Sequence, residues 1–259
     1  MPALPHLSMA LSSEPVSSEP ICNRPGKPLN SNSEQKHRPI RSYVIRGGRL
    51  TDSQRKAIEQ HWADYVLDFS NQQLDLDSLF PAAAPLTVEI GFGMGDSLLA
   101  MAAANPQQNF LGIEVHKPGV GKLLHGIAEQ GLTNLKVICH DAKEVIEQGL
   151  GSASVDRFLV FFPDPWHKKK HHKRRIIQPQ FSKLLSDRLK AGGKLHLATD
   201  WQAYAEHMLE VLEAEPSLKN ANGPGQYWLE PDRPETKFQR RGQRLGHGVW
   251  DLLYEKAAS

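Results

Sequence analysis

Short apolar runs alternate with helical segments through the middle of the chain, and this alternation most constrains the fold. The runs have the length of buried strands and lie at residues 86–90, 109–115, 135–139, 155–162 and 194–198. The helical patterns lie at residues 96–104, 118–130, 142–148 and 176–189. Strands that alternate with helices form βαβ units, which build a mostly parallel sheet with helices on both faces. The sequence therefore predicts an α/β fold.

Further elements are expected on either side of this central part. Thr51 and Gln54 have the spacing of a capping box at the start of a helix. Another helix is expected at residues 201–213. The last two strands are expected at residues 226–229 and 249–254, which makes seven strands together with the five above.

The first 38 residues differ in composition from the rest. They are rich in Pro, Ser, Glu and Asn and carry little periodic apolar content. Such a segment buries too little apolar surface to fold, so we expect a disordered tail at residues 1–38 and a single domain at residues 39–259. The basic residues around its end are either solvated or contribute to RNA binding; they are Lys36, Arg38, Arg41, Arg46 and Arg49.

Cysteine content and the length of apolar runs indicate the cellular setting. Cys22 and Cys139 are far apart and form no CxxC pattern, which predicts a reduced, cytoplasmic setting. The chain has no apolar run of about 18 residues and no signal-peptide pattern, so we expect no membrane span. No obligate protein partner is evident. The formal net charge is only +2, so any basic surface must be local.

Acidic residues stand at or just beyond the ends of the five central strands. They are Glu89, Glu114, Asp141, Asp164 and Asp200. In open parallel sheets, ligands bind in the crevice outside the carboxyl ends of the strands. Each acid alone has an ordinary alternative as a surface or helix-capping carboxylate. Five acids in equivalent places indicate a binding site.

A glycine-rich turn, with Gly91, Gly93 and Gly95, follows the first expected strand. Glycines permit a tight turn and let a ligand approach the backbone. A dinucleotide fingerprint would have glycine or alanine where this chain has Asp96, whose charge would face a pyrophosphate poorly. The turn therefore favours a ligand without phosphates, such as S-adenosylmethionine; a purely structural turn is the alternative.

Two of the acids suit parts of such a ligand. Glu114 lies 23 residues after Gly91, at the end of the second strand. A carboxylate about 20 residues after the glycine turn is placed to bind ribose hydroxyls. Asp141 follows the third strand and would bind the exocyclic amine of adenine.

A rigid acidic turn and a basic run follow the fourth expected strand. Pro163 and Pro165 restrict the backbone around Asp164 and hold it just past the strand end. Trp166 offers a stacking surface, and six Lys or Arg residues follow at positions 168–175. A basic run is often only a solvated surface, but this one adjoins an acid and an aromatic ring. It therefore predicts contact with nucleic-acid phosphates.

The histidines of the basic run do not predict a metal site. His167, His171 and His172 lack a second cluster of ligands at metal-binding spacing. A second basic stretch at residues 233–248 is either a loop that holds a base and its phosphates or an ordinary basic loop.

Four motifs together resemble the bacterial tRNA (guanine-N7-)-methyltransferase family, the TrmB type. They are Glu89-Ile90-Gly91-Phe92-Gly93-Met94-Gly95, Pro163-Asp164-Pro165-Trp166 with the basic run, Thr199-Asp200, and Arg233-Pro234 followed by Thr236-Lys237-Phe238 and Arg241-Gly242. The match runs from about residue 40 to about residue 256. The family usually has Glu after Thr-Lys-Phe, where this chain has Gln239, so a charge is lost at that position.

The resemblance implies a class I S-adenosylmethionine-dependent methyltransferase fold. It implies transfer of a methyl group from S-adenosylmethionine to N7 of a guanine in the variable loop of tRNA, forming 7-methylguanosine. The implied cofactor contacts are Glu89, Glu114, Asp141 and Asp164, to which the glycine turn adds Gly91 and Gly93; Asp164 is also the implied catalytic residue. The implied substrate contacts are Lys168, Asp200, Thr236, Lys237, Phe238 and Gln239. The implied RNA-binding residues are Lys170, His171, His172, Lys173, Arg174 and Arg175.

Three other functions fit parts of the pattern. A methyltransferase acting on another RNA or on an exocyclic amine is the nearest, although the basic run and the Thr-Lys-Phe loop disfavour the amine. A nicotinamide-dependent oxidoreductase is disfavoured by Asp96. A non-catalytic RNA-binding protein with a Rossmann-like domain would leave the strand-end acids without a ligand.

Overall fold

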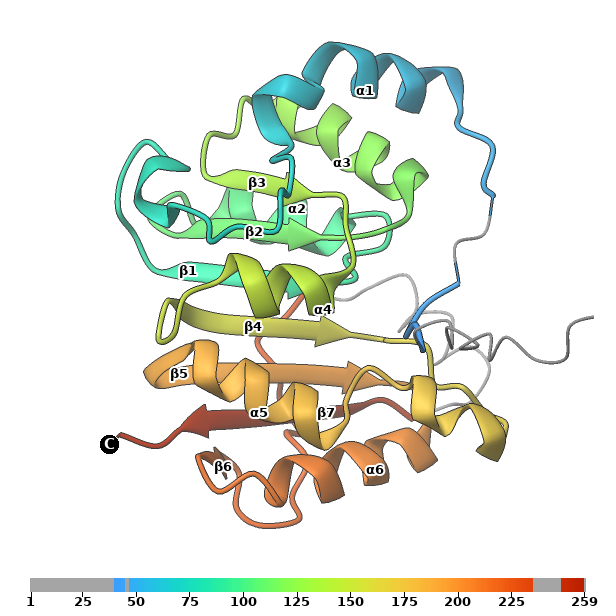
Figure 1. Ribbon diagram of the computed structural model, residues 1–259, viewed down its shortest axis with the longest axis vertical. Coiled ribbons are helices and arrows are strands. Elements are labelled where there is room, and N and C mark those ends of the chain that lie inside the picture. Colours follow the sequence, from blue (N-terminus) through green and yellow to red (C-terminus); the bar gives the residue numbers. More distant parts are fainter. Residues whose placement is uncertain (1–39, 45–46, 235–247, 259) are drawn as a thin grey trace, which may run out of the picture. The chain divides into compact units, whose positions relative to one another are not determined.

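One sheet organises the described part of the chain (Figure 1). The computed structural model describes residues 40–44, 47–234 and 248–258, so the predicted tail lies outside the described residues. Within them, seven strands pair in the order β3-β2-β1-β4-β5-β7-β6. Their bounds are β1 (Leu86–Ile90), β2 (Asn109–Ile113), β3 (Leu135–Ile138), β4 (Val155–Phe161), β5 (Leu189–Thr199), β6 (Leu218–Asn220) and β7 (Trp250–Lys256).

The strand order reverses at β1, which pairs in parallel with β2 on one side and with β4 on the other. β3 and β5 continue the parallel part, and β7 runs antiparallel between β5 and β6. At such a reversal the connections leave toward opposite faces of the sheet, which opens a crevice at the carboxyl ends of the strands. The predicted α/β fold with a mostly parallel, seven-stranded sheet is confirmed.

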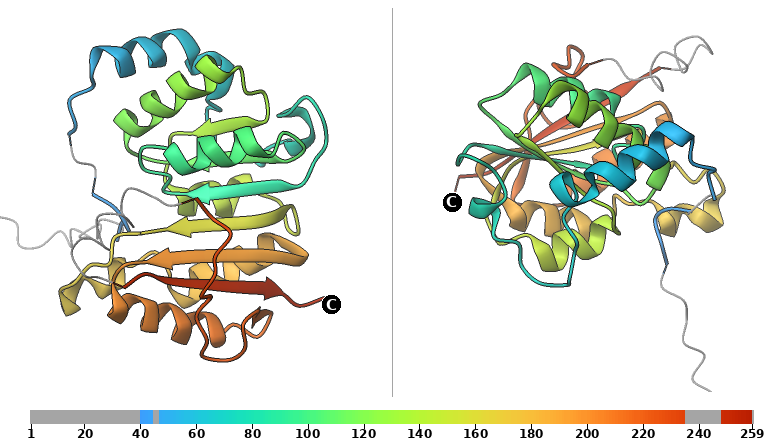
Figure 2. Two further views of the ribbon diagram at one scale, coloured as in Figure 1. Left: turned by 180° about the vertical axis from the view of Figure 1, so that it is seen from behind. Right: turned by 90° about the horizontal axis from the view of Figure 1, so that it is seen from above.

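Helices cover both faces of the sheet (Figure 2). On one face, Leu124 of α3 packs in a cluster with Phe110 of β2, joined by residues of α1 and α2. On the other face, Phe181 of α5 and Tyr204 of α6 pack in a cluster with Phe158 of β4. The helices are α1 (Asp52–Tyr65), α2 (Asp96–Ala104), α3 (Lys117–Gln130), α4 (Ala142–Glu144), α5 (Pro179–Arg188) and α6 (Gln202–Glu213), with short turns η1 (Leu76–Ser78), η2 (Val145–Gly149) and η3 (Lys169–Arg174).

Local sequence signals explain where several helices begin. Thr51 and Gln54 form the predicted capping box at the start of α1, each side chain accepting a hydrogen bond from the other residue's backbone N–H. Pro179 opens α5, so the predicted start at residue 176 was three residues too early. Proline is favoured at this first position because its missing N–H would have no helical partner there. None of the described helices is long and apolar enough to cross a bilayer.

The prediction was wrong at the far edge of the sheet. Residues 226–229 form no strand and contribute only an isolated bridge from Trp228 to Asp251. The edge strand is β6 instead, in which exposed Lys219 stands between buried Leu218 and Asn220. Three residues are too short for an alternating pattern to stand out from the neighbouring helix.

A buried charged cluster covers β5 and β7 on the face away from α5 and α6. The chain that follows β6 crosses these strands (Figure 2, left). Arg233 donates from Nε and Nη2 to the Asp251 carboxylate at 2.6 and 2.8 Å, and His196 Nε2 lies 2.8 Å from Asp251 Oδ1. Burial by itself raises the pKa of Asp251, but hydrogen bonds from Arg233 and His196 outweigh it and lower that pKa. Asp251 is therefore the anion that stabilises a buried guanidinium.

We expect Asp251→Ala to destabilise the fold strongly. The change removes the buried carboxylate that Arg233 and His196 share, and breaking a buried ion pair typically costs about 3–5 kcal/mol. Urea unfolding measures the loss in the free energy of unfolding. Asp187→Ala is the control, because Asp187 and Lys183 form an ion pair in which both side chains are exposed, by 46% and 64%, and exposed pairs contribute only about 0–1 kcal/mol. Equal losses in the two variants would contradict this account of the cluster.

Candidate active site

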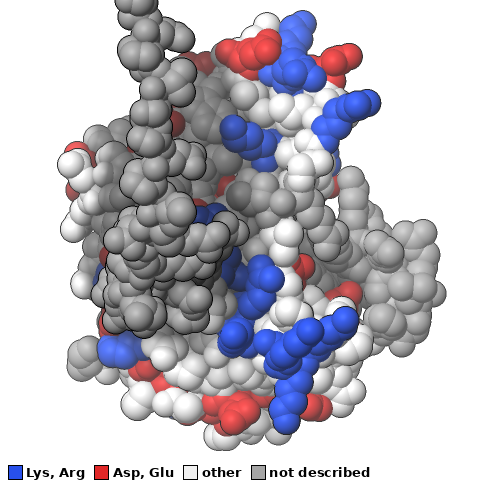
Figure 3. All heavy atoms as spheres, turned by 45° about the vertical axis from the view of Figure 1, so that its right-hand side comes forward, with Lys and Arg blue, Asp and Glu red and all other residues white. Residues whose placement is uncertain are grey.

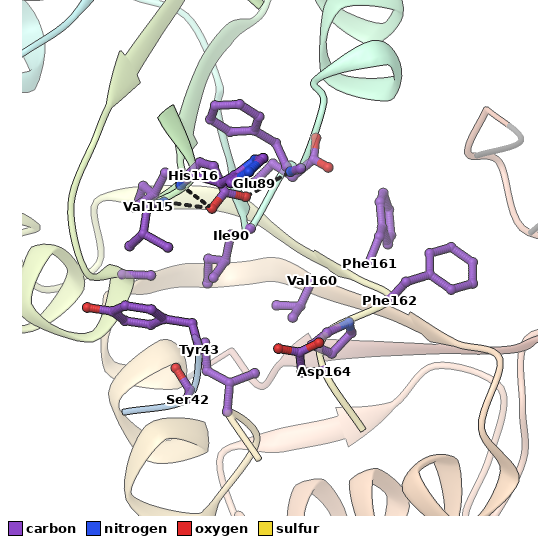
Figure 4. Close-up of a pocket in the computed structure, with 18 of the residues that line it drawn as sticks. Ser42, Tyr43, Glu89, Ile90, Val115, His116, Val160, Phe161, Phe162 and Asp164 are labelled. Carbon is purple, nitrogen blue, oxygen red and sulfur yellow. Dashed lines mark hydrogen bonds between the residues drawn. The ribbon is translucent and has the colours of Figure 1, made fainter. Parts of the chain in front are cut away.

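A cavity opens at the carboxyl ends of β1, β2 and β4, where the strand order reverses. Its volume is about 410 Å³, within the range of small-molecule sites, roughly 300–1,000 Å³. Glu89, Glu114, Asp141 and Asp164, four of the five strand-end acids, all line it. Figure 4 shows Glu89 and His116 on one side of the cavity and Asp164 on another. The fold thus brings together acids that are far apart in the sequence.

The glycine turn after β1 forms one wall of the cavity. Gly91, Gly93 and Gly95 have φ angles of 71°, 59° and 76°, in the left-handed region that favours glycine. A Cβ atom on Gly91 or Gly93 would meet open space, whereas one on Gly95 would collide with Leu123. The first two glycines are therefore needed for their backbone conformation, and they leave room for a ligand against the main chain.

Glu114 ties the end of β2 to the glycine turn. Its Oε2 atom accepts a hydrogen bond from the Gly93 N–H at 2.9 Å. Its Oε1 atom accepts from the N–H groups of Val115 and His116 at 2.6 and 2.9 Å, as the dashed lines in Figure 4 show. A carboxylate has about four lone-pair sites, so a further hydrogen bond from a ligand hydroxyl is possible. The ribose contact stays a prediction.

Glu89 is a buried carboxyl group that faces the cavity. The residue is 3% exposed, and its Oε2 atom has no hydrogen-bond partner within the described part of the chain. Burial first, and then the charge of nearby Glu114, raises the pKa of Glu89 to about 8. A buried acceptor without a partner is costly. Glu89 therefore fits a ligand that brings a cationic or N–H donor, such as the ammonium group of an amino acid.

Asp141 lies at another part of the cavity wall. As the N-cap of α4, its Oδ1 atom accepts from the Lys143 N–H at 3.0 Å. The Tyr43 phenol lies beside this carboxylate. Burial first, and then the charge of Asp141, raises the pKa of Tyr43. Ser42, Tyr43 and Val44 also line the cavity. These three residues are absent from the sequence prediction, because a short segment before the first helix carries no periodic signal.

Asp164 lies on a strained turn that follows β4. Phe162 and Trp166, on either side of the two prolines, have φ angles of 51° and 48°, a conformation that costs about 1–3 kcal/mol for residues other than glycine. Phe162 N–H donates to a β5 carbonyl at 2.8 Å, and the Pro165 carbonyl accepts from Arg175 Nε at 3.0 Å. These contacts hold the turn, and the Asp164 carboxylate is exposed at the cavity.

The basic run lies in and around η3. Some of its cations are exposed to solvent, and others contact groups within the protein. Figure 3 shows positive side chains in the lower half of the face that it draws and others near its upper end. Four lysines are exposed and suited to phosphate contact, namely Lys168, Lys169, Lys170 and Lys173. His171 and His172 are half-buried.

The two arginines of the run are used inside the protein. Arg175 is 2% exposed, and it donates to the carbonyls of Pro165 and Ala203 while its guanidinium stacks on Tyr204. Arg174 is half-buried and donates to backbone carbonyls at residues 41 and 43. An RNA contact for Arg175 would need this buried guanidinium to leave its partners, so its role in RNA binding stays an untested prediction.

The remaining predicted residues lie toward the end of β5 and beyond. Asp200 is half-buried just after β5, and it is not among the described residues that line the cavity. The next residue, Trp201, meets His167 edge to face at 4.2 Å, so the end of β5 adjoins the basic run. Among the described residues, no group of His, Cys, Asp or Glu is arranged to hold a metal ion. The predicted substrate contacts outside the described residues are Thr236, Lys237, Phe238 and Gln239.

The strand order, the glycine turn and the acids at the strand ends define a class I S-adenosylmethionine-dependent methyltransferase. A family model described as "Putative methyltransferase" matches residues 83–252. The chain belongs to the tRNA (guanine-N7-)-methyltransferase family. It is 54% identical over 226 residues to the tRNA (guanine-N(7)-)-methyltransferase of Pseudomonas fluorescens SBW25, which covers 87% of this chain and 94% of the relative.

Two further comparisons agree with this assignment. The tRNA (guanine-N(7)-)-methyltransferase of Pseudomonas entomophila L48 is 52% identical over 231 residues, covering 88% of this chain and 96% of that protein. Among solved structures, the 16S rRNA methyltransferase KamB has the same fold, with a TM-score of 0.52 and 19% identity over 72% of this chain and 95% of KamB. That likeness concerns the fold alone.

We expect Glu89→Gln to change how stability depends on pH. An unfolded Glu titrates near pH 4.3, roughly, whereas burial raises the pKa of folded Glu89 to about 8. The folded state then binds a proton more tightly, so the stability that neutral Glu89 contributes is present below the unfolded pKa and is lost as pH rises through the folded pKa. Thermal unfolding without ligand should therefore find Glu89→Gln more stable than the wild type at pH 9, by a margin that is much smaller at pH 5.

Glu129→Gln is the control for this experiment, because Glu129 is an exposed residue of α3. It should show the same pH dependence as the wild type. A stability difference between Glu89→Gln and the wild type that stays constant from pH 5 to pH 9 would contradict the raised pKa of Glu89.

Proposed function

We propose that the protein transfers a methyl group from S-adenosylmethionine to N7 of a guanine in the variable loop of tRNA, forming 7-methylguanosine in the cytoplasm. One observation carries this proposal. Glu89, whose Oε2 atom has no hydrogen-bond partner among the described residues, shares one cavity with the glycine turn held by Glu114 and with Asp164. The exposed lysines of the basic run begin four residues after Asp164. Membership of the family supports tRNA and guanine N7 as the substrate.

The cavity residues fit S-adenosylmethionine part by part. Glu89 offers a buried acceptor for an ammonium group, and Gly91 and Gly93 leave space against the backbone. Glu114 has acceptor capacity for ribose hydroxyls, and Asp141 for the exocyclic amine of adenine. When bound, S-adenosylmethionine supplies a methyl group on a positively charged sulfur.

The reaction asks the protein mainly for positioning. Guanine N7 carries an unprotonated lone pair, so no residue needs to remove a proton before attack. Holding the base in line with the methyl group converts a bimolecular step into an effectively unimolecular one. The stiff turn at Asp164, strained at Phe162 and Trp166 and held by Arg175, is suited to this task.

Asp164 has a second use, because the guanine ring gains positive charge as N7 is methylated. A fixed carboxylate at the edge of the cavity stabilises that charge as it develops. The same carboxylate is able to accept hydrogen bonds from guanine N–H groups. Lys168 and the exposed cations that follow it hold phosphates, and Asp200 reads a base edge near the end of β5.

Methylation of an unmodified tRNA transcript tests the function. Purified protein should form 7-methylguanosine, detected by nuclease digestion and mass spectrometry. A transcript with adenosine in place of the variable-loop guanosine should remain unmethylated. Ribosomal RNA is the second control, because methylation of ribosomal RNA without methylation of tRNA would favour a methyltransferase acting on another RNA. Failure to modify the tRNA would overturn the proposal.

We expect Asp164→Asn to lower the single-turnover rate constant by about 100-fold, as when one preorganised charge-stabilising group is removed. The measurement uses saturating S-adenosylmethionine and enzyme in excess over tRNA, so that binding defects do not contribute. Asp187→Asn is the control, because Asp187 forms an exposed ion pair with Lys183 on α5. A near-normal rate in Asp164→Asn would reject the charge-stabilising role and leave only positioning.

A further inference from the structure

The N-terminal segment of the described chain, residues 40–44, forms part of the cavity wall. Ser42, Tyr43 and Val44 line the cavity together with the strand-end acids. Figure 4 shows Ser42 and Tyr43 across the cavity from Glu89 and His116. A ligand that fills the cavity would therefore contact this segment as well as the sheet.

Two side chains from the Asp164 turn and the basic run hold the N-terminal segment. Trp166 Nε1 donates to the Ser42 carbonyl at 3.1 Å. Arg174 donates twice at 2.9 Å, from Nε to the Arg41 carbonyl and from Nη2 to the Tyr43 carbonyl. The Arg174 guanidinium also lies 3.8 Å from the centre of the Trp166 ring. One stacked pair of side chains thus binds three successive backbone carbonyls.

Few other contacts fix this segment. In the described part of the chain, no backbone hydrogen bond joins residues 40–44 to a strand or a helix. Ile40 and Val44 are apolar but 54% and 50% exposed, so their burial contributes little. Besides the Tyr43 side chain, which meets Asp141, the segment therefore depends for its position on Arg174 and Trp166.

Arg174 has a different environment from Lys173, its neighbour in the basic run. Its planar guanidinium donates to two carbonyls and stacks on an indole at the same time, a combination that a lysine ammonium does not reproduce. Lys173 is exposed, whereas Arg174 is half-buried between the segment and Trp166. Two adjacent cations of one motif therefore serve different partners.

We propose that Arg174 is a positioning residue of the cofactor site and that Tyr43 contacts the cofactor. Arg174 holds the backbone at residues 41–43, and Tyr43 then closes the cavity beside Asp141. An aromatic ring with a polar tip next to a carboxylate suits a purine that carries an amino group. This inference rests on the proposed function, because the purine is that of S-adenosylmethionine. It moves Arg174 from the RNA phosphates to the cofactor.

Calorimetric titration of the full chain with S-adenosylhomocysteine, without RNA, tests the proposal. Arg174→Ala should raise the Kd by about tenfold or more, as expected when hydrogen bonds from a charged donor are lost. Tyr43→Ala should raise it similarly. Lys173→Ala is the matched control and should stay within about twofold of the wild type, because exposed surface charges contribute little to a site they do not touch. Arg174→Lys keeps the charge but not the planar fork, so its Kd should also rise.

A second measurement separates a local from a general effect. Trypsin cleavage after Arg41, followed by mass spectrometry, should be faster in Arg174→Ala than in the wild type. S-adenosylhomocysteine should slow this cleavage in the wild type and much less in the variant. If Arg174→Ala does not fold, Arg174→Lys and Tyr43→Ala provide the same comparison.

RNA binding should distinguish the same two variants in the opposite direction, with Lys173→Ala affected and Arg174→Ala unaffected. The salt dependence of tRNA affinity should become shallower by about one unit of slope in Lys173→Ala, as for the loss of one phosphate contact, and should not change in Arg174→Ala. Wild-type affinity of Arg174→Ala for S-adenosylhomocysteine would overturn the inference. Absence of binding by the wild-type protein would instead overturn the proposed function, so the two failures are distinguishable.

Discussion

The parallel pairing of β1 with both β2 and β4 is the constraint on which the site depends. Because its two neighbours run in the same direction, their carboxyl ends meet at one edge, and their connections leave toward opposite faces. The glycine turn and the Asp164 turn both start from this edge. The hydrogen bonds of Glu114 then fix the glycine turn to the end of β2. Strand order thus makes the cavity, and side-chain contacts define its walls.

Two features of this cavity cost free energy, and contacts elsewhere in the fold must offset that cost. Glu89 is a buried carboxyl group whose Oε2 atom lacks a partner in the described chain, and Phe162 and Trp166 have left-handed backbones. Both features are unfavourable in isolation. At the Asp164 turn, the Arg175 hydrogen bond to the Pro165 carbonyl offsets part of this cost. Such pre-organisation leaves the ligand little reorganisation to drive when it binds.

Burial divides the positive charges of the protein into two groups. Arg175 and Arg233 act inside, where each has a backbone, aromatic or carboxylate partner. The lysines of η3 remain exposed. Arginine suits the inner positions because its planar group donates in several directions and stacks on rings. Lysine suits the outer positions, where a mobile point charge meets a phosphate.

The sequence by itself determined the order of the five central strands and their helices, the sheet class and four of the five acids that meet at the strand ends. Apolar runs, glycines and prolines report local conformation directly, which is why β1 and α2 were located correctly from their patterns alone. The three-residue strand β6 carried too little pattern to be recognised. Only the tertiary structure decided which basic residues face solvent, because Lys173, Arg174 and Arg175 are consecutive and alike in charge. Their roles differ because Arg174 stacks on Trp166 and is half-buried, whereas Arg175 stacks on Tyr204 in the interior. Such packing depends on segments distant in the chain.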